Sequence, residues 1–184
     1  MTFKIKEGDV IFCSSKLTWK SASLFPARFL IQATTLSQYE HAAQFINGKV
    51  AEANSKKGTI LTPLQQWLNS RYDFVTIDIL RPRKITEKQL GQILGHWVLS
   101  KGAKYPFSKA LYSSLDCLIP TFIKEPSLTK EQFCSEGVLR GLKRAVLLPE
   151  NLEASRYTPQ ELFELLAEFD FQHFEDINPK LIYS

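Results

Sequence analysis

The sequence has no long apolar run. A membrane-spanning helix needs about 20 consecutive apolar residues, and no stretch of this chain approaches that length. The opening residues, MTFKIKEGDV, carry charge and glycine and lack the apolar core of about 7–15 residues that an export signal requires. We therefore expect no transmembrane segment and a soluble, cytoplasmic protein, cellular or phage-encoded.

Cysteine is scarce, and the cysteines are scattered. Cys13, Cys117 and Cys134 form no C-x-x-C pair, which argues against a disulfide framework and a structural zinc site. The sequence also lacks a glycine-rich phosphate loop and the motifs H-E-x-x-H and G-x-S-x-G. We therefore expect no metal and no cofactor, and nucleotide-dependent and serine-hydrolase functions lose their usual support.

Charge of one sign is not concentrated anywhere. The chain carries 23 Lys and Arg against 19 Asp and Glu, a net charge of +4, and no basic block is longer than a doublet. Nucleic-acid-binding domains gather their basic residues on one face or along one helix. The sequence therefore predicts a solvated surface and no nucleic-acid partner, and it leaves the oligomeric state open.

The sequence does contain the apolar material of one compact domain. Its 184 residues are 44% hydrophobic, an ordinary globular value, and leave little room for two cores. We predict a single domain, residues 1–184, of the α+β class. Strands are expected at 9–13, 41–46, 49–54, 58–61 and 74–80, helices at 27–34, 63–69, 86–100, 108–118, 133–147 and from 158, and a final strand or a wrapping tail at 169–184.

The clearest local signal is a β-hairpin. Asn47-Gly48 separates two strand-like segments and supplies the positive φ angles of a type I′ turn. With Ile46 opposite Lys49, His41 and Glu52 become diagonal neighbours on one face. A histidine positioned by a carboxylate is the base and orienting half of a nucleophilic site. Taken singly, either residue could equally be an ordinary strand side chain.

Cys134 lies at or near the start of a predicted helix. A thiol at a helix N-terminus gains thiolate character from the unpaired N–H groups and the helix dipole. Two alternatives remain open: Thr129 with Gln132 would cap a helix that starts earlier, and Cys134 would serve as a small buried hydrophobe.

The other histidines and cysteines have less support as site residues. His96 is expected to be an exposed helix histidine, and His173, in an aromatic tail, is expected to pack. Cys13 and Cys117 lie in apolar stretches and are expected to be core thiols.

Four segments together resemble a known family. They are Gly8-Asp9-Val10-Ile11-Phe12, Ser37-Gln38-Tyr39-Glu40-His41-Ala42-Ala43, Val50-Ala51-Glu52-Ala53 and Phe133-Cys134-Ser135-Glu136-Gly137-Val138. In this order they resemble the permuted NlpC-type, papain-like cysteine hydrolases, often called YiiX-like. Circular permutation places histidine before cysteine in that family, as in this sequence. Gly137 departs from the pattern, which prefers a branched apolar residue there.

The resemblance implies a circularly permuted papain-like (NlpC-type) fold, with a central antiparallel sheet packed with helices. It also implies Cys134 as nucleophile, His41 as base and Glu52 as the orienting residue. Backbone N–H groups at the helix start, at Cys134 and Ser135, would bind the oxyanion. Tyr39 shares the strand parity of His41 and would line the cleft or assist the oxyanion.

The function predicted on this basis is a thiol hydrolase of the cysteine peptidase or amidase type, working through an acyl-enzyme. Its substrate would be a peptide, another amide or an acyl lipid, the classes on which the family and its relatives act. Two alternatives remain: a papain-like module that binds a peptide or lipid without turning it over, and an acyltransferase that passes the acyl group to an amine or alcohol.

Overall fold

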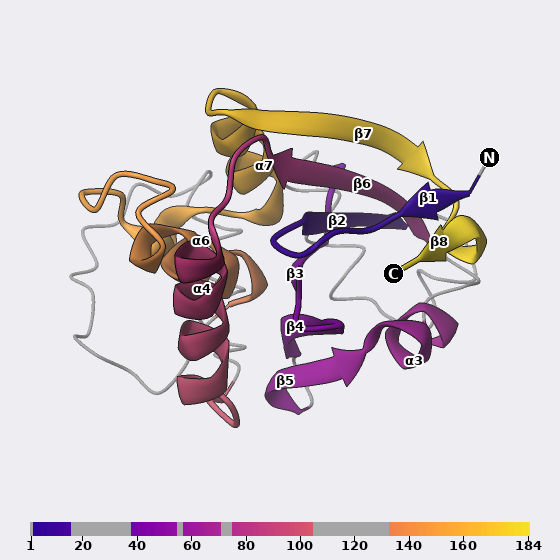
Figure 1. Ribbon diagram of the computed structural model, residues 1–184, viewed down its shortest axis with the longest axis horizontal. Helices are drawn as coiled ribbons and strands as arrows, with labels where there is room; N and C mark the ends of the chain where they lie inside the picture. Colours follow the sequence, from indigo (N-terminus) through magenta and orange to yellow (C-terminus); the bar gives the residue numbers. More distant parts are fainter. Residues whose placement is uncertain (1, 16–37, 55–56, 71–74, 105–132) are drawn as a thin grey trace, which may run out of the picture.

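A six-stranded antiparallel sheet forms the centre of the fold (Figure 1). The computed structural model describes residues 2–15, 38–54, 57–70, 75–104 and 133–184. The sheet order is β5-β4-β3-β2-β6-β7, and β1 pairs with β8 in a separate ribbon. The elements are β1 (Phe3–Lys4), β2 (Val10–Ser15), β3 (His41–Ile46), β4 (Lys49–Asn54), β5 (Gly58–Pro63), α3 (Leu64–Asn69), β6 (Val75–Pro82), α4 (Glu87–Leu99), α6 (Cys134–Arg144), η1 (Ala154–Arg156), α7 (Pro159–Ala167), β7 (Phe171–Ile177), η2 (Pro179–Leu181) and β8 (Ile182–Tyr183).

The predicted hairpin is present with the predicted bounds. Ile46 pairs with Lys49, and φ is 51° at Asn47 and 67° at Gly48. Both central residues therefore have the positive φ of a type I′ turn, which matches the twist of the two strands. The carboxylate of Glu7 accepts hydrogen bonds from the backbone N–H groups of Asn47 and Gly48. The turn residues and the Glu7 carboxylate thus both hold β3 and β4 in this register.

The two faces of the sheet are covered differently. Helices α4, α6 and α7 supply the side chains that pack with the cluster containing Phe12, Ala42 and Leu80. Helix α3 and the β1–β8 ribbon pack on the other face, in a cluster that contains Ala43 and Ile79. Figure 1 shows α4 and α6 side by side, away from α3. The alternation of the strands therefore sorts their side chains into two cores.

Helix α4 has the predicted start, but its buried face differs from the prediction. Thr86 and Gln89 form the expected capping box. His96, expected on the surface, is only 6% exposed. The helical spacing predicts one apolar stripe of Leu90, Ile93, Leu94, Trp97 and Val98, yet Val98 is 56% exposed. The side of α4 carrying Ile93, His96 and Trp97 faces the core, so the stripe predicted from apolar residues alone was rotated.

The other predicted elements are found within the described residues, with two adjustments. The helix predicted at 133–147 ends at Arg144, because Val146 takes a positive φ of 54° that a helix cannot continue through. The tail predicted at 169–184 forms β7 and then β8. The helices predicted at 27–34 and 108–118, and Cys117, lie outside the described residues.

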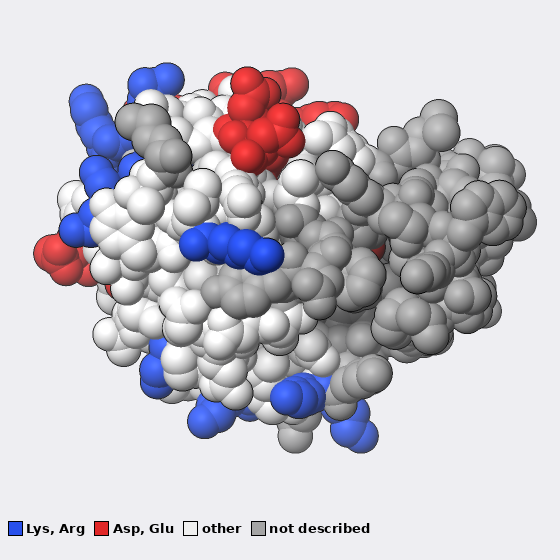
Figure 2. Space-filling view, turned by 90° about the vertical axis from the view of Figure 1, so that its right-hand side faces the viewer, with Lys and Arg blue, Asp and Glu red and all other residues white. Residues whose placement is uncertain are grey.

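The surface seen from the right of Figure 1 carries charges of both signs (Figure 2). Acidic side chains gather at the top of this face, and basic side chains lie at its upper left, along its lower edge and, singly, near its middle. Among the described residues, no helix is long and apolar enough to cross a membrane.

Candidate active site

The hairpin brings His41 and Glu52 into direct contact. His41 Nε2 lies 2.6 Å from Glu52 Oε2, and the Glu52 side chain is buried. Residue 41 begins β3, while residue 52 lies on β4 diagonally across from it. The contact between the two side chains expected from the turn is therefore present. A carboxylate on Nε2 leaves Nδ1 as the ring nitrogen available to a nucleophile.

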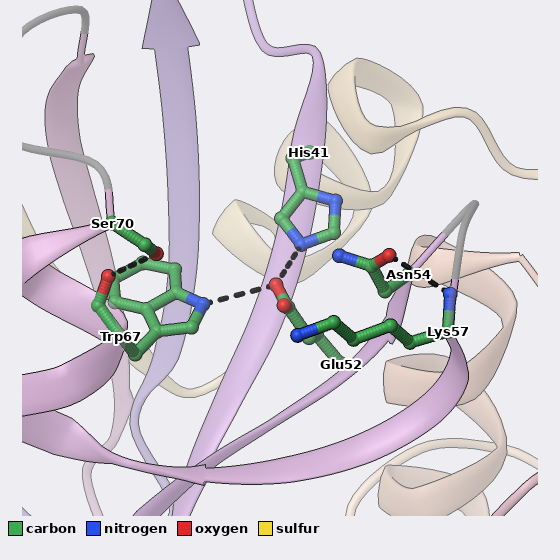
Figure 3. A network of polar contacts seen from close by, with 6 residues as sticks. All are labelled: His41, Glu52, Asn54, Lys57, Trp67 and Ser70. Carbon is green, nitrogen blue, oxygen red and sulfur yellow. Dashed lines mark hydrogen bonds and ion pairs between the residues drawn. The ribbon is translucent and has the colours of Figure 1, made fainter.

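A tryptophan also binds Glu52. Trp67 Nε1 donates a hydrogen bond of 3.0 Å to Oε2, the same oxygen that contacts His41 (Figure 3). Trp67 belongs to α3, and Figure 3 shows its ring and the His41 ring approaching Glu52 from different directions. The sequence gives Trp67 no predicted role, because nothing in the spacing of Trp67 and Glu52 indicates that α3 folds back over β4.

Cys134 is the first residue of α6. Phe133 before it has extended backbone (φ −78°, ψ 168°), so the helix does not start earlier, at Thr129. The carboxylate of Glu136 accepts a hydrogen bond of 3.1 Å from the Phe133 N–H and forms an ion pair of 2.5 Å with Arg140. A carboxylate in the first turn also complements the helix dipole. Glu136 thus fixes the helix start that carries the thiol.

The electrostatics favour a thiolate–imidazolium pair. Burial alone would raise the pKa of Cys134, but the charge and hydrogen bond of His41 and the N–H groups of Ala42 and Ser135 outweigh it and lower this pKa. Burial alone would lower the pKa of His41, but the neighbouring Cys134 thiolate and Glu52 carboxylate raise it to about 9. Both shifts move the pair towards its charged form, a thiolate beside an imidazolium, which is the nucleophilic state of a cysteine.

Ser135 and Tyr39 lie in different surroundings. The backbone N–H of Ser135 donates to the Cys134 sulfur, and its hydroxyl donates to the carbonyl of Tyr157. The oxyanion role predicted for Ser135 stays a prediction. Tyr39 precedes β3, so the strand parity assumed for it does not hold. Its ring packs against Phe12 on the helix-covered face, and its hydroxyl donates to Asp78. Burial and Asp78 both raise the pKa of Tyr39. Because its hydroxyl is bound to Asp78, a role of Tyr39 in the cleft or at the oxyanion stays a prediction.

The remaining histidines lie in separate environments. Burial, followed by the charge of Arg144, lowers the pKa of His96 to about 4. His96 is therefore a neutral core histidine, contrary to the exposed position expected for it. His173 packs against the Phe163 ring, as expected, and its Nε2 lies 3.1 Å from Asp78. Cys13 is buried in β2, as expected of a core thiol.

The fold and these side chains describe a papain-like α+β protein with a cysteine, a histidine and a glutamate in series. No family model matches the sequence, and no curated protein matches it. Among solved structures, the crystal structure of the metalloprotein YiiX from Escherichia coli O157:H7 resembles this one with a TM-score of 0.51. The two are 21% identical, over 78% of this chain and 67% of that chain. The YiiX-like fold expected from the motifs is thereby confirmed.

The metalloprotein description of YiiX raises the question of a metal in this chain. Metal ligands converge on one point, whereas His41 here stands between Cys134 and Glu52. Across the described ranges, no group of three or more His, Cys, Asp or Glu side chains is placed to hold a metal ion. The Cys134, His41 and Glu52 side chains therefore do not fit a metal centre.

Proposed function

We propose that this chain is a thiol hydrolase that cleaves an amide or acyl bond through an acyl-enzyme on Cys134. The observation that carries the proposal is the series Cys134–His41–Glu52, in which the thiol pKa is lowered and the imidazole pKa is raised. A cysteine that serves only as core packing has no need of such a partner. The substrate class is a peptide amide or an acyl lipid.

In the first half-reaction, the Cys134 thiolate attacks the substrate carbonyl carbon and its electron pair forms the C–S bond. The carbonyl oxygen becomes an oxyanion, and the backbone N–H groups at the start of α6, at Cys134 and Ser135, are its donors in this proposal; the Ser135 N–H lies beside the sulfur. Each such donor is worth about 2.7–4 kcal/mol where one has been removed from a model enzyme. The imidazolium of His41 then protonates the leaving amine or alkoxide, and a thioester remains.

In the second half-reaction, neutral His41 takes a proton from water, and the resulting hydroxide attacks the thioester. The C–S bond breaks, the acid leaves, and the thiolate–imidazolium pair is restored. Glu52 does not accept the proton. Its carboxylate holds Nε2–H, orients the ring and stabilises the positive charge that appears on His41.

The test is the pH dependence of iodoacetamide alkylation at Cys134, followed by mass spectrometry. In the wild type we expect an apparent pKa below the ordinary value of about 8.5. In His41→Ala we expect a pKa above 8.5, because burial continues to oppose the thiolate after its partner is gone. Cys134 is only 4% exposed, which slows the access of the reagent. The result is therefore read from the pH at which alkylation rises, and not from the absolute alkylation rate.

His173→Ala is the matched control, because it removes a histidine that is also paired with a carboxylate, Asp78. It should leave the Cys134 profile unchanged. A Cys134 pKa near 8.5 that is the same in wild type and His41→Ala would contradict the hydrolase and favour the binding-module alternative. If thioester formation occurs but product appears only when an amine or alcohol acceptor is added, the chain is an acyltransferase.

The pH dependence of turnover should depend on the leaving group. For a peptide p-nitroanilide, kcat/KM should rise as Cys134 ionises and fall as the pH passes about 9, where His41 loses the proton that the leaving amine requires. A p-nitrophenyl acyl ester has a leaving group that needs no proton, so its kcat/KM should not fall near pH 9. An identical alkaline limb for both substrates would argue against His41 as the general acid.

A further inference from the structure

One oxygen of the Glu52 carboxylate contacts both His41 and Trp67. Glu52 Oε2 lies 2.6 Å from His41 Nε2 and accepts a 3.0 Å hydrogen bond from Trp67 Nε1. The Glu52 carboxylate and the Trp67 ring are both buried. An indole N–H only donates and does not titrate, so this contact has one polarity at every pH. It therefore favours the ionised carboxylate and opposes its protonated form.

The surroundings hold the indole in place. Helix α3 follows β5 directly, and β5 pairs with β4 in a register that sets Ile60 opposite Glu52. Leu64 and Leu68 on the same helix pack with Trp67 in the core on the α3 face of the sheet. Ser70 Oγ donates to the Trp67 carbonyl at 2.7 Å and closes the helix (Figure 3). A helix this short has little stability of its own, so tertiary packing fixes the ring.

We propose that Trp67 is a positioning residue of the thiol site: its indole N–H holds the Glu52 carboxylate in the orientation that receives His41. The inference rests on the proposed function, in which His41 and Cys134 carry the chemistry. In this proposal Trp67 carries no chemical step. It acts through Glu52, in the way that outer hydrogen bonds orient the ligands of a metal site. Losing the N–H leaves the carboxylate less well oriented and weakens its support of the imidazolium.

The chain offers a matched control for this indole. Trp97 is 0% exposed and Trp67 is 1% exposed, and each donates its Nε1–H to a side-chain oxygen. Trp97 Nε1 lies 2.9 Å from Gln44 Oε1, on the sheet face opposite Trp67. Trp67→Phe and Trp97→Phe therefore remove the same buried ring volume and the same kind of hydrogen bond. Only the first removes a donor to Glu52.

Two readouts separate positioning from packing. We expect both variants to lower the urea midpoint of unfolding by a similar amount. Trp67→Phe alone should move the alkylation profile of Cys134 to higher pH by up to about one pKa unit, the size expected for loss of a hydrogen bond to a charged group. Trp67→Phe alone should also lower the pKa of His41 from about 9, measured by NMR of the imidazole ring carbons. With a turnover substrate, kcat should fall while KM changes little.

The outcomes distinguish this inference from the proposed function. If Trp67→Phe and Trp97→Phe give the same His41 pKa and the same alkylation profile, the positioning role is wrong, although His41→Ala would still support the hydrolase. If the apparent pKa of Cys134 is the same in wild type and His41→Ala, the proposed hydrolase function is wrong. A His41 pKa that is lowered by Trp67→Phe and not by Trp97→Phe would still support the positioning of Glu52 by the indole. Should Trp67→Phe not fold, benzothienylalanine at position 67 replaces the N–H by sulfur, keeps the ring shape, and is read by the same two measurements.

Discussion

Replacing Glu52 by glutamine should slow hydrolysis by about 10²–10⁴-fold, the range of general acid–base catalysis. A glutamine amide carries no charge, so it does not stabilise the imidazolium that His41 becomes. Because Glu52 raises the pKa of His41, that pKa should fall in Glu52→Gln. A less charged His41 supports the thiolate less, so the pKa of Cys134 should rise. The measurements are kcat/KM for an activated acyl ester and the alkylation profile of Cys134.

Asp78→Asn provides the control for Glu52→Gln. Asp78 is also a buried carboxylate, and it too lies beside a histidine, at 3.1 Å from His173. Asp78→Asn should lower stability, because Tyr39 and the Asp176 backbone also donate to this carboxylate. It should leave the Cys134 profile unchanged. Equal losses of activity in both variants would assign the effect of Glu52→Gln to general destabilisation.

Replacing Arg81 by methionine should destabilise the fold by about 3–5 kcal/mol, the cost of breaking a buried ion pair from one side. Arg81 Nε and Nη2 each lie 2.8 Å from a different oxygen of Asp9, which is fully buried. Asp9 ends the turn that leads into β2, the strand between β3 and β6. Without the guanidinium, the buried carboxylate would lose its ion-pair partner and keep the backbone N–H of Lys6 as a donor. Chemical denaturation at pH 7 measures the loss.

The destabilisation of Arg81→Met should depend on pH with a definite sign. Burial already raises the pKa of Asp9 despite the opposing effect of Arg81, and loss of Arg81 raises it further. A folded state with the higher carboxyl pKa binds more protons than the unfolded state, so its stability decreases as the pH rises through that range. The variant should therefore recover stability relative to wild type as the pH falls from 7 towards 5.

Arg83→Met is the matched control for Arg81→Met. Arg83 also pairs with an aspartate, Asp170, but both side chains are mostly exposed, at 58% and 68%. An exposed pair contributes about 0–1 kcal/mol, so this variant should unfold close to the wild type at every pH. A loss in Arg81→Met no larger than in Arg83→Met would contradict the role assigned to the buried pair.

Local signals predicted much of the fold and half of the candidate site. The Asn47-Gly48 turn fixed a register, and that register alone placed His41 beside Glu52. Local capping residues also mark the predicted helix starts: Thr86 with Gln89 forms a capping-box pattern before α4, and Thr158 caps α7 before Pro159. In each case the interaction spans a few residues, so the sequence contains all the information that the geometry requires.

Long-range packing was the part that the sequence did not reveal. His96 was expected on the surface because imidazole is polar, yet α4 turns it inward beside Trp97. Tyr39 was placed by strand parity, but the strand begins only at His41. The contact of Trp67 with Glu52 depends on how a short helix folds back over the sheet. Periodicity within one element carries no information about which neighbouring element covers it.

The order of the site residues along the chain has a consequence for folding. His41 and Glu52 meet across a two-residue turn, a contact that closes a short loop, whereas Cys134 joins them only when α6 docks. Long-range contacts cost more loop-closure entropy than local ones. The lowered thiol pKa therefore exists only after this long-range step. During refolding, pulse alkylation at several pH values would report the docking of α6 as a fall in the apparent pKa of Cys134.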